Sequence, residues 1–579
     1  MRAYGLLVDW YLTNRAVLWV EVSFMESVSW ASSKRSLTVV GQRFWPSLAV
    51  GVFTVITVAA VFWIVQHPFG TNWDEANYLN QAILDRTALT QGPWDLIKGL
   101  FRRDVARPPA YRILVLPITA LVGAHPTVLR LCSWLALGVT LFLVYLTGQR
   151  LVDRGTGGFA VCVLLACPIV IGPNMRFYVD YSLYLAIAGT LYFLFCQWDK
   201  PADQPRHWIG LGLFLGLGAM AKPTIAFIVG PMLMVTMALR LLRWIAGPTL
   251  PSLFKSYGLA CGILAPWWLL NGDDALAKAF RSGGNVRDAL GPEGELGTLL
   301  KWGYVFVQSV TGPLIGILAG AIALSFCISV VIRRRLALSR SHLLALVVCL
   351  AGAVPLAVVA ALGVNHNPRL IAPLLLPLGL AISLMASALG WLTRKPTAIL
   401  ATVLIVAQVS VMLAPQPGSD RYQDGDAFAQ RHNWGNPTSV MRLEEQWDWT
   451  PLYGLAQQYQ LQTPKIGYLG SAKTLNPPQL LLPWVRANQT AKVDQLWNFA
   501  DGPLAWDSLL KRAANRDILV TFAPEPSVTA SEIETMENQY NLEFSERVAQ
   551  TGAFMPVQTL TMGKFSSSAV YVFIKQERS

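Results

Sequence analysis

Charged side chains are scarce in this chain. They make up 14% of its 579 residues, against roughly 25% in ordinary soluble proteins. Hydrophobic residues make up 53%, the mean hydropathy is +0.42, and the apolar residues gather in long runs between residues 46 and 414. This composition excludes a soluble globular protein and predicts a polytopic helical membrane protein.

Cysteine and the common catalytic motifs are absent from residues 415–579. Disulfide bonds therefore cannot stabilise this tail, even in an oxidising compartment. The tail also lacks GxGxxG, GxxxxGK[ST], HExxH, CxxC and GxSxG, so it predicts no chemistry of its own. All seven cysteines lie inside the apolar runs, where we expect them to be core residues: Cys132, Cys162, Cys167, Cys196, Cys261, Cys327 and Cys349.

The net charge of +12 does not indicate a nucleic-acid partner, because no basic surface interleaved with aromatic residues accompanies it. The basic residues instead stand in short clusters between apolar runs, which is the positive-inside pattern of membrane proteins. The clusters are Lys34, Arg35 and Arg43; Arg150 and Arg154; Arg240 and Arg243; Arg333, Arg334 and Arg335; and Arg394 and Lys395.

The apolar runs predict about eleven transmembrane helices. With the first cluster in the cytoplasm, an odd number of crossings places every later basic cluster there too. We therefore expect a cytoplasmic segment at 1–45, a transmembrane domain at 46–414 with a large outer loop at 67–127, and a soluble extracytoplasmic domain at 415–579. The predicted spans are 46–66, 128–148, 158–174, 179–197, 208–221, 224–243, 254–270, 303–332, 342–363, 370–390 and 397–414.

Two apolar segments do not fit a simple span. Residues 110–124 are too short to cross and contain Arg112 and Pro117, so we expect a helix lying at the outer surface or against the bundle. Residues 209–242 would make a helix of about 51 Å, too long for one span and too short for two. A hairpin that breaks at Lys222-Pro223 resolves this, because proline disfavours helix in the residue before it.

The tail reads as an α/β domain. Short β-rich runs occur at 466–470, 517–522 and 569–575. Helical patterns occur at 504–514 and 529–541, the second opening with Thr529 and Glu532 at the spacing of a capping box. The overall prediction is a mainly α polytopic membrane protein with a C-terminal soluble α/β domain.

Carboxylates beside the predicted membrane are the first candidates for chemistry. Asp74 and Glu75 follow the first span, and adjacent carboxylates can do acid/base work or hold a cation. They equally suit the N-terminus of a helix over 75–84. Asp180 stands just inside the fourth span, where a carboxylate needs a partner, so a functional role is favoured.

Cations stand on the same predicted face of the membrane. Arg107, Lys222 and Arg369 suit a phosphate group, and with the carboxylates they indicate an anionic-lipid substrate. Arg107 would equally contact lipid headgroups from a loop, Arg369 would equally snorkel at a helix end, and His366 is equally an exposed loop residue. Arg176 lies on this face as well.

A series of short motifs resembles the GT-C class of membrane glycosyltransferases, in the branch that contains protein O-mannosyltransferases and the bacterial lipid A aminoarabinose transferase. The resemblance covers residues 46–414 and rests on the order and spacing of the motifs. They are WDEANY (73–78), RPPAY (107–111), YVDYSLY (178–184), GLGAMAKP (216–223), PWW (266–268) and RLIAPLLLP (369–377).

The resemblance implies a glycosyltransferase with a polyprenyl-phosphate-linked sugar donor, an acceptor hydroxyl on a lipid, glycan or protein, and amphipathic helices of the outer loop lying on membrane lipids. It places the enzyme in the cell envelope, as a multi-pass protein of a bacterial inner membrane with its tail in the periplasm or outside. Direct displacement would invert the anomeric centre.

Carried over by position, the resemblance assigns each candidate a role. Asp74 and Glu75 become the catalytic residues, with Asp74 as the general base and Glu75 as the neighbour that shapes the site. Asp180 becomes a second acid of the cavity. The expected substrate contacts are Tyr78, Arg107, Tyr111, Asp180, Lys222, His366 and Arg369, of which Arg107 and Lys222 face the donor phosphate.

Two departures from the family pattern are Arg107, where lysine or histidine is frequent, and Pro223, where glycine is frequent. No cofactor is required by the sequence. A divalent cation at Asp74, Glu75 and Asp180 stays open, although no histidine-rich ligand set calls for one.

Two other classes of function compete with this hypothesis. A secondary transporter would place charges near the midplane between internal repeats, and neither feature is visible. A membrane assembly component with a partner-binding outer domain would explain the tail but would leave Asp74, Asp180 and Lys222 without a purpose.

Overall fold

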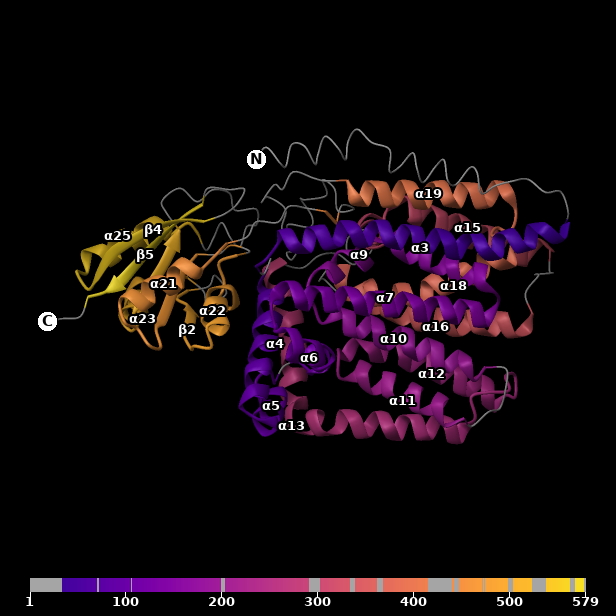
Figure 1. Ribbon diagram of the computed structural model, residues 1–579, viewed down its shortest axis with the longest axis horizontal. Coiled ribbons are helices and arrows are strands. Elements are labelled where there is room, and N and C mark those ends of the chain that lie inside the picture. The colour runs from indigo at the N-terminus through magenta and orange to yellow at the C-terminus, as the bar shows by residue number, and fades with distance from the viewer. Residues whose placement is uncertain are drawn as a thin grey trace.

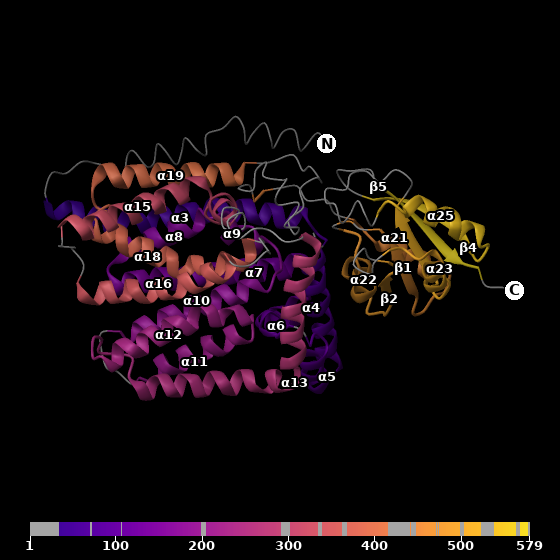
Figure 2. The same ribbon diagram turned by 180° about the vertical axis from the view of Figure 1, so that it is seen from behind.

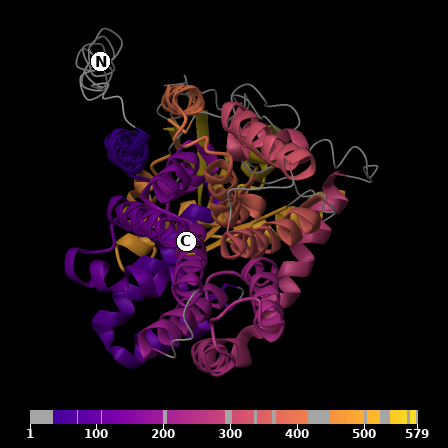
Figure 3. The same ribbon diagram turned by 90° about the vertical axis from the view of Figure 1, so that its right-hand side faces the viewer.

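The fold is a helical bundle that carries a smaller α/β domain at one end (Figure 1). Figure 3 views the bundle from its opposite end, so that the C-terminal domain lies behind the helices. The structure is a computed structural model that describes residues 34–69, 72–105, 107–198, 204–290, 302–333, 339–361, 368–414, 440–441, 447–470, 472, 474–497, 503–522, 538–562 and 568–576.

The bundle region is built from apolar helices joined by short breaks. Its α-helices are α3 (Lys34–Gln66), α4 (Trp73–Gln91), α5 (Pro93–Arg102), α6 (Ala110–Val122), α7 (Pro126–Leu151), α8 (Arg154–Leu165), α9 (Pro168–Ile171), α10 (Asp180–Cys196), α11 (Pro205–Ala219), α12 (Ala226–Leu241), α13 (Leu250–Leu290), α15 (Pro313–Arg333), α16 (Arg340–Ala361), α17 (Pro368–Ile371), α18 (Leu375–Ala388) and α19 (Lys395–Leu413). The tighter or wider turns are η1 (Pro173–Met175), η2 (Pro223–Ile225), η4 (Ala372–Leu374) and the π-helix η3 (Phe306–Thr311).

The polytopic membrane class is confirmed. Within the described residues, eight helices are long and apolar enough to cross a membrane, or up to nine if the bent pair formed by α8 and the helix after it is one span. The predicted spans 179–197 and 208–221 also form helices, but α10 has 17 residues and α11 has 15. Both are shorter than the roughly 20 residues of a full crossing.

Proline and glycine break two of the predicted spans. Residues 158–174 form two helices bent by 85°, because Pro168 starts a new helix where its missing N–H costs nothing. Residues 303–332 divide at Gly312, which has a φ of 77°. A side chain there would be strained and would also meet the amide of Gln408.

The two segments that did not fit a simple span behave as predicted. Helix α6 has 13 residues, and Arg112 in it is buried. The segment 209–242 forms a hairpin in which α11 ends at Ala219 and Lys222 is extended, with φ −159° and ψ 135°, before Pro223. Lys222 therefore lies at the tip of the hairpin.

One prediction about the cysteines is wrong in part. Cys132, Cys162, Cys167 and Cys349 are buried and Cys196 is half-buried, but Cys261 and Cys327 are exposed. Both exposed thiols lie on helices that face outward from the bundle, where the surrounding lipid is as apolar as a protein core.

Helices α4, α5 and α6 lie across the end of the bundle that faces the C-terminal domain (Figures 1 and 2). Helix α5 is amphipathic: Gly99 and Leu100 are buried, whereas Trp94 and Ile97 are exposed. This pattern is typical of a helix that lies in a membrane interface.

The C-terminal domain has a five-stranded sheet in the order β2-β1-β3-β5-β4, with β1 parallel to both β2 and β3 and with β5 antiparallel to β3 and β4. The predicted α/β domain is confirmed, and the predicted strands at 466–470, 517–522 and 569–575 correspond to β1, β3 and β5. The strands are β1 (Lys465–Leu469), β2 (Lys492–Gln495), β3 (Ile518–Phe522), β4 (Phe554–Met562) and β5 (Ser568–Lys575), and the helices are α21 (Thr450–Gln458), α22 (Pro477–Arg486), α23 (Trp506–Ala514) and α25 (Asn541–Gln550).

Helices cover both faces of this sheet. Leu480 and Trp484 of α22 belong to one apolar core, and Leu509 of α23 and Phe544 of α25 belong to the other. The predicted helix at 504–514 is therefore present as α23. The proposed capping box at Thr529 and Glu532 lies outside the described residues.

Candidate active site

The N-terminus of α4 places two neighbouring carboxylates in different environments. Asn72 caps the helix, because its side chain accepts a hydrogen bond from the backbone N–H of Glu75 at 3.0 Å. Asp74 and Glu75 then lie in the first turn. The Asp74 side chain is 39% exposed, whereas the Glu75 side chain is 0% exposed.

Glu75 is held by a buried arginine from α7. The guanidinium of Arg130 donates from Nε to Oε1 and from Nη2 to Oε2 of Glu75, both at 2.8 Å. Oε1 also accepts from the backbone N–H of Phe177 at 2.9 Å. Arg130 additionally donates to the backbone carbonyls of His67 and Phe69. This two-bond pair fixes the start of α4 against the bundle.

Arg369 joins the two remaining carboxylates. Its Nη1 donates to Oδ2 of Asp74 at 3.1 Å, while its Nη2 and Nε donate to Oδ2 of Asp180 at 2.8 and 3.1 Å. Its guanidinium also lies over the ring of Tyr178, 3.8 Å from the centroid. Segments from α4, α10 and α17, far apart in sequence, thus converge on one planar cation.

Two more cations complete the cluster. Lys222, at the tip of the α11–α12 hairpin, donates to Oδ1 of Asp180 at 3.2 Å. Arg107 lies 3.5 Å from Oδ1 of Asp74 and over the ring of Tyr78, 5.2 Å from its centroid. Asp180 is buried and takes both of its partners from other elements, which gives it the partner that a carboxylate near the membrane needs.

Tyrosines form one wall of the cluster. Tyr78 and Tyr111 pack edge to face, with ring centroids 5.0 Å apart. Burial raises the pKa of both hydroxyls above the usual value for tyrosine, so both stay protonated and can donate. The Tyr111 hydroxyl is buried and has no hydrogen-bond partner among the residues that the structure describes.

The electrostatics of the cluster favour an anion. Burial on its own lowers the pKa of the Arg107 guanidinium, but Tyr78 and Asp74 raise it, and the pKa ends above its ordinary value. Arg107 therefore stays charged. Together with Lys222 and Arg369 it presents fixed positive groups in a partly buried site, where a charge-assisted contact to an anion is stronger than in water.

The structure brings most of the predicted site residues together. Those in the cluster are Asp74, Tyr78, Arg107, Tyr111, Asp180, Lys222 and Arg369. Glu75 is adjacent to Asp74 in sequence, but its carboxylate faces Arg130. His366 lies outside the described residues. Arg176 donates to the backbone carbonyl of Gly172 and lies over the ring of Trp63 instead of joining the cluster.

Sequence reasoning missed Arg130 and Tyr178. Arg130 stands three residues inside the predicted span 128–148, and a cation in such a position is a functional candidate by default, so the signal was present. Tyr178 belongs to the YVDYSLY motif, but its stacking on Arg369 depends on tertiary placement.

A second missed group fixes the outer-loop helices to one another. Asp85 of α4 lies 2.6 Å from Nη1 of Arg103 and 3.2 Å from Nη1 of Arg112, both measured to its carboxylate oxygens. Burial raises the pKa of Asp85, and the two arginines oppose that rise. Arg112 is thus paired with a buried carboxylate, which explains how the apolar helix α6 accommodates an arginine.

Metal coordination can be examined only in the part of the chain that the structure describes. There, no group of three histidine, cysteine, aspartate or glutamate side chains is placed to hold a metal ion. The carboxylates of Asp74 and Asp180 contact cationic side chains.

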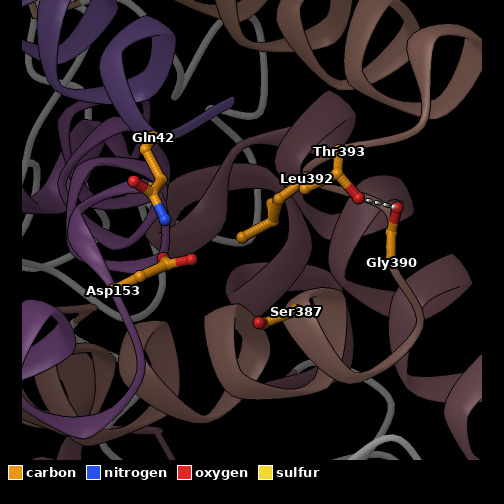
Figure 4. Close-up of a pocket in the computed structure, with 7 residues that line it drawn as sticks. Gln42, Asp153, Ser387, Gly390, Leu392 and Thr393 are labelled. Carbon is orange, nitrogen blue, oxygen red and sulfur yellow. Dashed lines mark hydrogen bonds between the residues drawn. The ribbon is translucent and has the colours of Figure 1, made fainter. Parts of the chain in front are cut away.

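A hollow lies just after the C-terminal end of α7, the helix that carries Arg130 near its N-terminal end (Figure 4). Its lining residues are Gln42, Asp153, Gly155, Ser387, Gly390, Leu392 and Thr393. Asp153 caps α8 there, accepting from the backbone N–H of Thr156 at 2.8 Å and from its hydroxyl at 2.9 Å. The one charged group of this hollow therefore has a structural role.

Comparisons with known proteins agree with this architecture. A family model described as dolichyl-phosphate-mannose-protein mannosyltransferase matches residues 106–269. That segment contains RPPAY, YVDYSLY, GLGAMAKP and PWW. A comparison with curated proteins finds no match.

One solved structure shows the same fold at low sequence identity, and others have lower TM-scores. ArnT from Cupriavidus metallidurans bound to undecaprenyl phosphate superposes with a TM-score of 0.52 and 14% identity, covering 90% of this chain and 97% of ArnT. The arabinofuranosyltransferase AftD from Mycobacteria gives a TM-score of 0.48 and 13% identity, covering 95% of this chain and 40% of AftD. The apo oligosaccharyltransferase of Archaeoglobus fulgidus gives 0.44 and 13%, covering 82% and 69%.

The chain has the fold of the GT-C class of membrane glycosyltransferases, as its motifs predicted. Within that class, its described architecture matches ArnT over nearly the whole length of both chains.

Proposed function

We propose that this protein transfers a sugar from a polyprenyl-phosphate donor to an acceptor hydroxyl, with inversion at the anomeric carbon. The observation that carries the proposal is the arrangement around Arg369, which joins Asp74 to Asp180 within reach of Lys222 and Arg107. This arrangement supports the proposal because a candidate base lies beside cations that suit a phosphate.

Asp74 is suited to act as the general base because it is the exposed carboxylate of the cluster. Its oxygens contact Arg369 and Arg107. A donor phosphate competes with Asp74 for these cations, because phosphate accepts the same charge-assisted hydrogen bonds. Binding of the donor thus frees a carboxylate oxygen to take the proton from the acceptor hydroxyl.

The proposed reaction is a single displacement in which every bond formed is matched by a bond broken. The acceptor oxygen forms a bond to the anomeric carbon while the bond from that carbon to the phosphate oxygen breaks, and the acceptor proton moves to Asp74. The phosphate leaves with increased negative charge. Arg107, Lys222 and Arg369 would stabilise that charge, since fixed cations in a partly desolvated site contribute most where charge develops.

Glu75 and Asp180 would serve this chemistry indirectly. Glu75 holds the start of α4 through Arg130 and does not face the cluster. Asp180 orients Lys222 and Arg369 by accepting from both. Tyr111 offers a buried hydroxyl beside the cluster, unpartnered within the described part of the chain, that can donate to the sugar or to the phosphate.

Two comparisons support the donor class. The ArnT structure that shares this fold is bound to undecaprenyl phosphate, and the family whose model matches residues 106–269 is described by a dolichyl-phosphate-mannose donor. Undecaprenyl phosphate and dolichyl phosphate are both polyprenyl phosphates. The sugar and the acceptor of this chain are left to experiment.

The sidedness of the protein is part of the proposal. The basic clusters support a cytoplasmic N-terminus and an extracytoplasmic outer loop and C-terminal domain. Cysteine labelling tests this at Gln458, which is exposed on α21, in a background where Cys261 and Cys327 are serine because both native thiols are exposed. Labelling of Gln458→Cys only from the cytoplasmic side would overturn the assignment.

Purified protein incubated with labelled polyprenyl-phosphate sugars tests the activity. The proposal expects release of polyprenyl phosphate that depends on an acceptor and on Asp74. A transporter would bind or move the labelled sugar lipid without cleaving it, and an assembly component would do neither.

A further inference from the structure

Helix α22 of the C-terminal domain has two apolar faces that serve different partners. Leu480 and Trp484, four residues apart, pack into the core of their own domain. Leu482 and Val485, three residues apart, pack with Ile83 of α4. Residues three and four apart share a face of a helix, so one face belongs to the domain and the other is committed to α4.

Polar contacts continue this interface toward the start of α4. The side-chain amide of Asn80 donates to the backbone carbonyl of Pro478 at 2.8 Å, and the amide of Gln479 donates to the backbone carbonyl of Asn72 at 3.5 Å. Both Asn80 and Gln479 are buried. Asn72 is the residue that caps α4, two positions before Asp74.

The interface ends at Arg486, the last residue of α22. Its Nη2 lies 2.9 Å from Nε2 of His125, which precedes α7, and its guanidinium lies over the ring of Phe69. Arginine cannot accept a hydrogen bond, so in this contact Nε2 of His125 is the acceptor. The C-terminal domain thus contacts the chain on both sides of the outer-loop helices.

We propose that α22 positions the candidate base, with Leu482, Val485 and Gln479 as the positioning residues that hold the first turns of α4 at the cation cluster. The inference rests on the proposed role of Asp74. It assigns the C-terminal domain a part in the chemical step, although the domain contributes no side chain to the cluster among the described residues.

The geometry supports this because α4 is held from two sides. From the bundle, Arg130 donates two hydrogen bonds to Glu75. From the other side, α22 contacts Asn72, Asn80 and Ile83. Asp74 and Asn80 lie about 9 Å apart along the helix, at 1.5 Å per residue. Release of the outer contacts would let the Asp74 carboxylate move, and a displacement of about 1 Å can cost a factor of about 100 in rate.

Release of α22 should change the affinity for the donor less than it changes the rate of transfer. Lys222 and Arg369 come from the hairpin tip and from α17, and neither residue contacts α22 in the described interface. Two of the cations that would hold the phosphate, Lys222 and Arg369, are therefore expected to keep their places when α22 is released.

The test compares Leu482→Ser/Val485→Ser with Leu542→Ser in the full-length protein. Leu542 is an exposed leucine on α25 of the same domain, so the control makes the same chemical change away from α4. We expect the double variant to lose at least about tenfold in kcat with its Kd for donor unchanged within about twofold, and the control to match wild type in both. Leu482→Met, which conserves volume, should keep wild-type kcat.

Gln479→Ala gives a milder version of the same test, since it removes one contact and leaves both apolar side chains in place. It should lower kcat less than the double variant does, again without weakening donor binding. Unchanged kcat in the double variant would overturn the inference. Loss of kcat together with an equal loss of donor affinity would overturn it as well, because that result describes general disruption of the site.

Hydrogen–deuterium exchange separates this inference from the proposed function. Release of α22 should speed amide exchange in residues 73–80 in the double variant and not in Leu542→Ser. If wild-type protein cleaves no polyprenyl-phosphate sugar but this exchange difference appears, the proposed function fails and the docking of α22 on α4 stands. If exchange is the same in both variants, the positioning inference fails whatever the activity.

Discussion

Replacement of Arg130 by methionine should destabilise the protein strongly. The Glu75 and Arg130 side chains are both 0% exposed, with bonds of 2.8 Å from Nε and Nη2. Arg130→Met leaves Glu75 with a backbone N–H from Phe177 at 2.9 Å but without its cation. Breaking a buried pair by removing one partner costs about 3–5 kcal/mol, because an uncompensated charge stays buried.

A thermal unfolding series in detergent measures this effect. At 2–4 °C per kcal/mol for mid-sized domains, Arg130→Met should lower the unfolding midpoint by about 6 °C or more. Glu75→Gln/Arg130→Met should recover part of the loss, because glutamine still accepts from Phe177 and carries no charge. An Arg130→Met protein as stable as wild type, or strictly additive effects in the double variant, would refute the reasoning.

Three further outcomes follow from the cluster and from the α22 interface. Arg107→Ala should weaken donor binding by about 1.5–3 kcal/mol, the range for a hydrogen bond to a charged group, and unchanged affinity in a binding assay would contradict this. Lys222→Met should also weaken donor binding, and equilibrium binding of a polyprenyl-phosphate sugar checks it, with restoration by Lys222→Arg as the control. Burial lowers the pKa of His125, and the nearby Arg486 and Arg130 lower it further. Because docking of α22 favours the neutral imidazole, it should be complete above the ordinary histidine pKa of about 6.5 and should weaken as the pH falls below that value. Exchange of residues 73–80 measured at two pH values checks this, and the same pH response in His125→Gln would assign the effect to another group.

Much of this architecture was predictable because it depends on local physics. Long apolar runs between basic clusters predict helices and their order, and Lys222-Pro223 predicts the hairpin tip from backbone sterics alone. The charged residues of the cluster could be identified from the sequence, because they are charges beside the membrane, where charge is costly. These signals need no knowledge of which side chain meets which.

The partners of those charges were not predictable in the same way. In the sequence, Arg369 suits a phosphate contact and a snorkelling position at a helix end equally, until the fold shows it between Asp74 and Asp180. The same holds for Glu75, which reads as a second catalytic acid in sequence and is paired with Arg130 in the fold. Pairing is set by tertiary packing that no local pattern encodes.

Two strands escaped prediction for identifiable reasons. β2 has four residues, KVDQ, and its side chains alternate between exposed and half-buried, so no apolar pattern distinguishes it. β4 contains Pro556, which argues against a strand, and the ladder with β5 shifts its register between Pro556 and Gln558. The proline is accommodated at an irregular point of the outermost strand.

The central claim is tested most directly by measuring two quantities for the Asp74→Asn variant: the rate of sugar transfer and the affinity for the donor. Asparagine keeps the shape of the aspartate but cannot take a proton at neutral pH, and a positioned base typically contributes 10²–10⁴-fold, so turnover should fall by at least about a hundredfold with donor still bound. Asp153→Asn is the matched control, because it alters a carboxylate just after the C-terminal end of α7 whose capping bonds asparagine can also make. Near-normal turnover in Asp74→Asn, or an equal loss in Asp153→Asn, would contradict the assignment of Asp74 as the base.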